Sequence, residues 1–577
     1  MTHRPDWQPL AALLVLAWCA QYWTMARSTV PAQDSVRFMA FARAASAYGW
    51  PATMTDRNDS PVFPAIVSLV HGAIQVFSSP ADGWALSVTW AAALPAVLAV
   101  FPLYGILRRA FDRRVALVST ALFCVVPTVA RLGADGLSDS TQLLLVLLAV
   151  WAWMAAEETD NQAVRWARWL SAGACLGLAC LTRIEAAAMA PAMLISASWT
   201  SAGKPRSQAG VALAIGLMLW FFPYVATTGK VTPKHSLRFL ADLTSVATST
   251  QAAGGQTKPP VESATAATDG IPRSFDPKDL SITSRRYGYA AALAEFFREL
   301  PHGWGYFSGL LSIAGVVLMR QSARVDFDLL VGVFLVTYLA ALLHYAAGAG
   351  YLASRHFLLP SVLTLGWAGV AIVRLMDKLG VVVVTRWPQI SPRVVPVVLM
   401  LSAALVCLAP HFKPLRTNRL AYRRAGEWLA ETAGVGATIL DTRQWTALYS
   451  GRTTYGADAS VVALADPLLN YVVVERLEIE RSSSRAQTLR ALIARHAVSL
   501  VGFTDSGQIS PDPEESSVLV YQWNPAGDDR IRETIARRTF RTRARTASQH
   551  RILSNQDTPP RLPATAHPDR VDPALEL

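Results

Sequence analysis

The feature that most constrains this fold is a succession of apolar runs, each long enough to cross a lipid bilayer as a helix. One crossing needs about 20 apolar residues. We place spans at about 9–26, 84–107, 115–131, 138–156, 168–182, 185–201, 208–226, 303–320, 327–347, 356–375 and 394–411. About eleven such runs predict an all-α polytopic membrane domain. The apolar stretch 60–78 carries His71 and Gln75, so we expect a helix lying in the interface.

The composition agrees with a membrane protein and weighs against other classes. Only 16% of the 577 residues are charged and 52% are hydrophobic, whereas a typical soluble domain is about 25% charged. The net charge of +12 comes largely from short loops between apolar runs, so we expect no nucleic-acid partner. The five cysteines all lie in apolar runs, without the spacing of a disulfide framework or a zinc site.

The basic loops fix one orientation in the membrane. The loop "RRAFDRR" and the other arginine-rich loops all fall on one side, which is cytoplasmic by the positive-inside rule. The N-terminus is then cytoplasmic, its first apolar run is an uncleaved span, and everything after residue 411 is extracytoplasmic. We expect a multi-pass protein of a bacterial inner (cytoplasmic) membrane, surrounded by membrane lipids.

Composition also divides the chain into domains. Residues 1–411 form the predicted transmembrane domain, with a site-bearing outer loop at 27–83 and a flexible outer loop at 227–302. Residues 412–527 contain short β-rich runs such as "LNYVVVE" and a helical "AQTLRALIARH", which predict a small α/β soluble domain. Residues 528–577 are basic and Pro-rich, and we expect a disordered tail.

Charged residues beside membrane spans are costly and often mark a functional site. In this orientation the candidates gather on the outer side: Asp34, Arg37, Asp59, Arg131, Asp135, Asp139, Arg183, Glu185, Lys230, Lys234, Arg355 and His356. Structural roles compete with functional ones, since Asp34 could cap a helix and Arg183 could pair with Glu185 at a hairpin tip. Together, however, cations suited to a phosphate and a carboxylate suited to a general base predict chemistry on a lipid phosphate.

The order of motifs resembles that of the GT-C membrane glycosyltransferases of the protein O-mannosyltransferase and aminoarabinose-transferase type. The family's acidic pair in the first outer loop corresponds to Asp34 and Ser35, with Arg37 following. "SPVFP" resembles its Pro-Pro-Leu-Tyr-Pro element, with Phe63 in place of tyrosine. "GLSDS", "LTRIE" (with Ile184 in place of proline) and "SRHFLLP" resemble its later elements. The likeness covers about residues 1–410.

The resemblance implies an inverting glycosyltransferase that moves a sugar from a polyprenyl-phosphate donor to an extracytoplasmic lipid, glycan or protein acceptor. It implies that Asp34 is the general base. The residues implied to contact the donor phosphate are Arg37, Arg183, Lys234 and Arg355. Ser35 stands where the family has a second acid, so the pair does not predict a metal site. The cofactor is left open, with a divalent metal as the one candidate, and the "WWDYG" motif of N-linked oligosaccharyltransferases is missing from the sequence.

Two other functions fit a membrane protein with outer-face charges. A transporter or flippase of a lipid-linked or anionic substrate uses intramembrane charges, but such proteins often contain inverted repeats and broken helices near the midplane. A lipid-sugar ligase or polymerase of another membrane fold is the third hypothesis. The sequence specifies neither the sugar nor the acceptor.

Overall fold

In the computed structural model the chain forms two compact units, one ending at residue 420 and one from residue 421 onward. It describes residues 7–57, 59–77, 80–200, 206–230, 288–318, 325–349, 351–389, 391, 394–408, 412, 416–456, 459–466 and 468–524. Lys234, most of the predicted outer loop 227–302 and the predicted tail 528–577 lie outside these ranges. The two units are described separately below.

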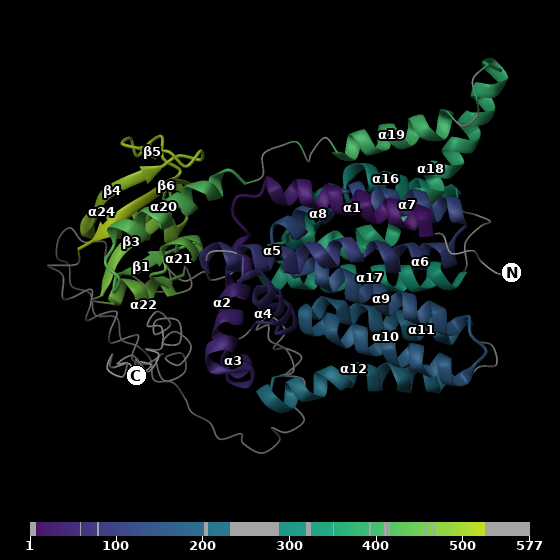
Figure 1. Ribbon diagram of the computed structural model, residues 1–577, viewed down its shortest axis with the longest axis horizontal. Coiled ribbons are helices and arrows are strands. Elements are labelled where there is room, and N and C mark those ends of the chain that lie inside the picture. Colours follow the sequence, from purple (N-terminus) through teal and green to yellow (C-terminus); the bar gives the residue numbers. More distant parts are fainter. Residues whose placement is uncertain are drawn as a thin grey trace, which may run out of the picture. The chain divides into compact units, whose positions relative to one another are not determined.

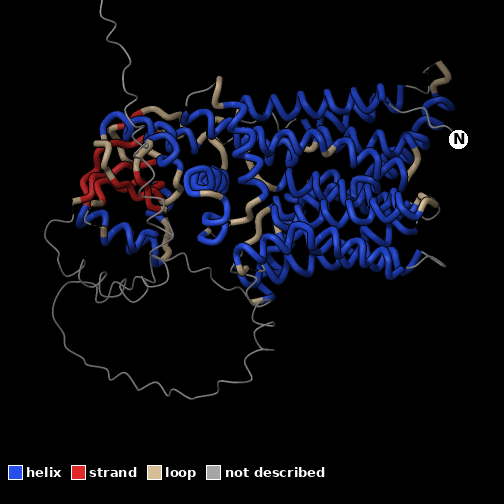
Figure 2. Tube along the Cα trace, turned by 60° about the horizontal axis from the view of Figure 1, so that its bottom comes forward, coloured by secondary structure: helices blue, strands red, loops and turns tan. Residues whose placement is uncertain are grey.

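The first unit is built from helices that lie side by side, with α2, α3 and α4 grouped at one end of the long helices (Figures 1 and 2). In chain order the helices are α1 (Trp7–Ala26), α2 (Gln33–Tyr48), α3 (Trp50–Asp56), α4 (Val62–Ile74), α5 (Pro80–Leu98), α6 (Val100–Ala110), α7 (Arg113–Val125), α8 (Pro127–Ala134), α9 (Asp139–Glu157), α10 (Gln162–Thr182), η1 (Ile184–Ala188), α11 (Met189–Thr200), α12 (Arg206–Thr228), α15 (Tyr289–Trp304), α16 (Tyr306–Leu318), α17 (Val325–Ala349), η3 (Ser354–Phe357), α18 (Leu358–Arg386) and α19 (Val394–Leu408). The elements η1 and η3 are short 3₁₀ helices.

Six of the described helical segments are long and apolar enough to cross a membrane, and the bent pair α7–α8 makes a seventh if it is one span. The six are α1, the α5–α6 segment, α9, α12, α17 and the η3–α18 segment. The other predicted spans also fall on helices, namely α10, α11, α16 and α19. Large apolar side chains such as Leu219 and Phe222 on α12 are 57% and 70% exposed, as expected for a surface that contacts lipid. The all-α membrane domain is therefore confirmed.

Small residues allow close contact between helices inside this unit. A Cβ at Gly173 of α10 would collide with the backbone carbonyl of Leu213 on α12, and one at Gly216 of α12 would collide with that of Leu170 on α10. Helices in a membrane associate largely through such packing, because lipid is as apolar as the side chains. The two glycines thus allow close contact between the backbones of α10 and α12 at two positions.

The start of α2 is held by hydrogen bonds to the turn that joins α8 and α9. The Ala32 amide donates to the Asp135 carbonyl oxygen at 2.9 Å. The Ser35 hydroxyl, which is fully buried, donates to the carbonyl oxygens of Asp135 and Gly136 at 2.7 and 2.9 Å. Gly136 has a φ of +69°, a conformation that glycine adopts without cost. These bonds fix where α2 begins.

The second unit contains a six-stranded mixed sheet with the strand order β2-β1-β3-β6-β4-β5. The strands are β1 (Thr438–Asp441), β2 (Thr453–Tyr455), β3 (Leu469–Glu475), β4 (Ala497–Phe503), β5 (Ile509–Ser510) and β6 (Val518–Trp523), and the helices are α20 (Asn418–Thr432, which begins in the first unit), α21 (Trp445–Ser450), α22 (Ser460–Ala465), α23 (Arg476–Glu480) and α24 (Ser484–His496). Strands β1, β2 and β3 are parallel, whereas β6 pairs antiparallel with β3 and β4. The predicted small α/β domain is therefore confirmed, while its exact boundaries stay a prediction.

Gly136 provides a test of how α2 is anchored. A Cβ there would lie 3.1 Å from Val88 Cγ1 and 3.2 Å from Ser35 Oγ, and a non-glycine residue at positive φ costs about 1–3 kcal/mol. We expect G136A to lower the midpoint of unfolding in mild detergent. The control is G332A in the interior of α17, where a Cβ meets no atom within 4 Å and alanine stabilises a helix by roughly 1 kcal/mol relative to glycine. Equal unfolding midpoints for G136A and G332A would contradict the conclusion that the turn at Gly136 anchors α2.

Candidate active site

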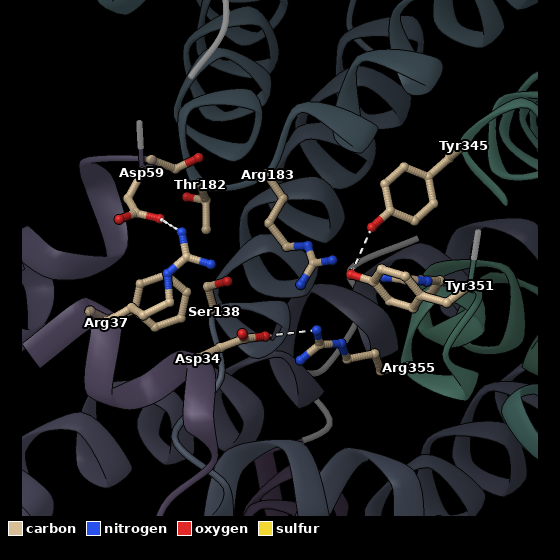
Figure 3. A pocket seen from close by; sticks show the side chains of 12 residues that line it. Asp34, Arg37, Asp59, Ser138, Thr182, Arg183, Tyr345, Tyr351 and Arg355 are labelled. Atoms are coloured by element: carbon tan, nitrogen blue, oxygen red, sulfur yellow. Dashed lines mark hydrogen bonds and ion pairs between the residues drawn. The ribbon is translucent and has the colours of Figure 1, made fainter. Parts of the chain in front are cut away.

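A pocket of about 250 Å³ lies where α2, the loop before α4, the end of α10, the end of α17 and η3 come together (Figure 3). It is lined by Asp34, Arg37, Phe38, Asp59, Ser60, Ser138, Thr182, Arg183, Tyr345, Tyr351, Arg355 and His356. Six of the twelve residues predicted for the site are among them. Segments that are distant in the sequence therefore supply one polar cavity.

Asp34 and Arg355 form an ion pair at one side of the pocket. Asp34 lies in the first turn of α2, and Ala32, rather than Asp34, occupies the capping position. The Asp34 carboxylate lies 2.7 Å from the Arg355 guanidinium, and the two side chains are 37% and 23% exposed. Asp34 therefore faces the pocket instead of capping its own helix, and Figure 3 shows both groups at its edge.

The surroundings keep Asp34 ionised. Burial among protein groups raises the pKa of the Asp34 carboxyl, but attraction to Arg355 and a hydrogen bond from it act in the opposite direction, helped by the charges of Arg37 and Arg183. The net effect holds the pKa of Asp34 below its usual 3.8. The carboxylate thus carries its negative charge, and can accept a proton, at every pH near neutrality.

Arg183 points into the middle of the pocket (Figure 3). It follows the last residue of α10 in an extended conformation, and its guanidinium lies 2.8 Å from the Asp139 carboxylate and 3.7 Å from that of Glu185. Its side chain is only 12% exposed. A buried arginine needs such partners, because an uncompensated charge away from water is very unfavourable. The two acids behind Arg183 hold it in one place.

Arg37 and Asp59 form a third ion pair, with 2.9 Å between the guanidinium and the carboxylate. Arg37 is 52% exposed, so this pair contacts solvent more than the others. Figure 3 places Arg37 and Asp59 on one side of the pocket and Tyr345 and Tyr351 on the other. Three guanidinium groups from three separate elements thus surround one small space.

Six uncharged lining residues were not among those predicted: Phe38, Ser60, Ser138, Thr182, Tyr345 and Tyr351. The Tyr345 hydroxyl donates to the Tyr351 hydroxyl at 2.9 Å, and both rings lie near the ring of His356. Two of the six had a signal in the sequence, because Ser138 and Thr182 directly precede the charged residues Asp139 and Arg183. The aromatic residues had none beyond their place at the outer end of a span.

The other predicted residues do not line this pocket in the described structure. Asp139 and Glu185 lie behind Arg183, as described above, and Arg131 is near the end of α8. Asp135 binds Arg419 at 2.6 Å. Lys230 donates to the carbonyl oxygens of Thr55 and Arg57 at the end of α3. Lys234 is outside the described residues.

The described residues also include side chains of the types that bind metal ions. Among them, no group of three or more His, Cys, Asp or Glu side chains is arranged to hold a metal ion. The position after Asp34 is Ser35, whose hydroxyl is used for the bonds to the α8–α9 turn. The side chains of this pocket therefore do not fit a metal centre, and no step below uses one.

The sequence and the fold both match known proteins. Residues 59–226 match the family model described as dolichyl-phosphate-mannose-protein mannosyltransferase. No curated protein sequence matches the chain significantly.

Among solved structures, ArnT from Cupriavidus metallidurans bound to undecaprenyl phosphate is similar over 89% of this chain and 98% of that one, at 12% identity and a TM-score of 0.54. The apo structure of the same protein is similar over 89% of this chain and 97% of that one, at 12% identity and a TM-score of 0.51. The Archaeoglobus fulgidus oligosaccharyltransferase, in complex with Zn and sulfate, is similar over 87% of this chain and 72% of that one, at 12% identity and a TM-score of 0.50.

At this level of identity the property shared with the solved structures is the fold. That fold covers most of the chain, and the family model matches the part from Asp59 to α12. The glycosyltransferase hypothesis is thereby favoured over the transporter hypothesis. Together, the match of residues 59–226 to this family model and the fold shared with these solved structures support the assignment of the chain as an integral membrane glycosyltransferase with the GT-C fold.

Proposed function

We propose that the protein transfers a single sugar from a polyprenyl-phosphate donor to a hydroxyl group of an extracytoplasmic acceptor, with inversion at the anomeric carbon. The observation that carries the proposal is one ionised carboxylate, Asp34, that faces a small pocket together with three arginines. The acceptor belongs to the class of lipids, glycans or proteins that carry a free hydroxyl.

The arginines suit the donor phosphate. Guanidinium groups bind phosphate oxygens through paired hydrogen bonds and stay charged at any physiological pH. Arg183 is held by acids on its far side and Arg355 stands beside Asp34, so both present donors to the same space. The solved ArnT structure with this fold has undecaprenyl phosphate bound, which supports a lipid phosphate as the ligand.

Asp34 suits the role of general base. In the transfer, the acceptor oxygen bonds to the anomeric carbon while its proton passes to the Asp34 carboxylate. The bond from the anomeric carbon to the phosphate oxygen breaks, and its electron pair leaves with the phosphate. Arg183 and Arg355 stabilise the negative charge that grows on that oxygen. One direct displacement of this kind inverts the anomeric centre without a covalent glycosyl-enzyme.

The size of the pocket favours one sugar unit at a time. Cavities for drug-sized ligands are typically about 300–1,000 Å³, whereas this pocket has about 250 Å³. A monosaccharide and the adjoining phosphate are the part of the donor that such a space accepts. The long isoprenoid tail would then lie along the apolar helices, in contact with the membrane.

The orientation of the protein follows from its basic loops, and we propose that the pocket opens on the extracytoplasmic side. Positively charged loops concentrate in the cytoplasm, which puts α2, η3 and the second unit on the outer face of a bacterial inner membrane. On this basis the domain at 412–527 is extracytoplasmic, where it can meet the acceptor.

Replacement of Asp34 tests the proposed chemistry. D34N keeps the shape of the side chain but removes the proton acceptor, so we expect sugar transfer from a polyprenyl-phosphate donor to fall by about 10²–10⁴-fold. The matched control is D377N, because Asp377 forms an exposed ion pair with Arg114 away from the pocket. Transfer by D34N at close to the wild-type rate would overturn the role of Asp34.

The Asp34–Arg355 pair also predicts a pH dependence. Because the pKa of Asp34 lies below 3.8, the wild-type protein should lose no activity through this group as the pH falls from 8 to about 5. R355Q removes the positive charge that does most to lower the pKa of Asp34, while the burial that raises this pKa remains. The pKa of Asp34 should therefore rise, and activity should decline at mildly acidic pH. The measurement is kcat/KM from pH 4.5 to 8, normalised for each variant, with R114Q as control. Superimposable profiles for R355Q and R114Q would contradict the prediction.

A further inference from the structure

Arg419 is a buried arginine that joins two connections of the first unit. It lies in the first turn of α20 and is 5% exposed. One nitrogen of its guanidinium donates to the Val30 carbonyl oxygen at 3.0 Å and to the Asp135 carboxylate at 2.6 Å. Val30 belongs to the connection between α1 and α2, and Asp135 to the connection between α8 and α9. A single side chain thus ties these two connections together.

The same two connections determine where α2 begins. Through its backbone carbonyl, Asp135 accepts hydrogen bonds from the Ala32 amide and the Ser35 hydroxyl. Arg419 holds this residue by its side chain, and α2 holds it by its carbonyl. Ser35 is fully buried and directly follows Asp34 along the helix. A path of hydrogen bonds therefore runs from Arg419 through Asp135 to Ser35, which is the residue beside the proposed base.

Charge makes this path sensitive to the loss of Arg419. Asp135 is 6% exposed, and a carboxylate in such a place needs a cationic partner. Arg416 lies 3.5 Å from its other oxygen, but the Arg416 side chain is 57% exposed. Without Arg419, the more exposed Arg416 can compensate the charge and keep the fold, but it does not supply the bond to Val30. The turn that holds α2 would then be free to shift.

We propose that Arg419 is a positioning residue that sets the place of Asp34 in the pocket through Asp135 and Ser35. The proposal rests on the proposed function, in which Asp34 is the general base. A displacement of about 1 Å caused by a change far from the chemistry can cost 10²-fold in rate. Arg419 is not among the described residues that line the pocket.

The first part of the test separates rate from binding. R419M should lower kcat by roughly 10²-fold and leave the KM for the polyprenyl-phosphate donor within about threefold, because Arg183 and Arg355 stand on other elements. R419K keeps a cation near Asp135 and should recover part of the loss. The control is R452M, which removes an arginine of the second unit that binds two backbone carbonyl oxygens, those of Ala430 and Ala433. R452M should keep the wild-type kcat.

The second part asks whether Arg419 acts through the path described. If it does, the loss of kcat in R419M/S35A should be close to that of the more severe single variant rather than the product of the two. In a D34N background, R419M should cause no further loss. A wild-type kcat in R419M, multiplied losses with S35A, or a further loss in D34N would each overturn the proposal. Full activity of D34N itself would instead overturn the proposed function, so the two failures can be told apart.

Discussion

The ion pair between Asp34 and Arg355 joins an early segment of the first unit to a late one at the edge of the pocket. Asp34 comes from α2, whereas Arg355 comes from η3, which leads into the long helix α18. The two side chains are partly exposed, and their opposite charges attract each other across the two segments. The segment at the end of α10 is likewise joined to the start of α9 by an ion pair, between Arg183 and Asp139.

Each arginine in the pocket has its own carboxylate: Arg37 has Asp59, Arg183 has Asp139 and Arg355 has Asp34. A guanidinium has five N–H donors, so one carboxylate cannot engage all of them; Arg183 also has Glu185 at 3.7 Å. The ion pairs therefore fix the positions of the cations. Donors that are fixed before the ligand arrives need little reorganisation during the reaction.

Much of the membrane domain could be predicted from the sequence, because a helix that crosses a bilayer needs a run of apolar residues that is easy to recognise. The charges beside those runs were also visible, but not which of them face one another. Asp135 and Asp139 are only four residues apart in the sequence, yet one pairs with Arg419 and the other with Arg183. Nothing in the sequence distinguishes Arg419, because it lies in a polar segment where arginines are common. Partner choice depends on packing between distant segments, which hydropathy does not record.

The three arginines have a consequence for what happens after the sugar has left. The phosphodiester of the proposed donor carries one negative charge, whereas the phosphomonoester that remains carries about 1.5–2 at neutral pH. In the proposed reaction, a cluster of fixed cations would therefore hold the spent lipid carrier more firmly than the loaded one. Turnover would then depend on how fast the carrier escapes, and the build-up of unloaded carrier in the membrane would slow the enzyme by occupying the pocket.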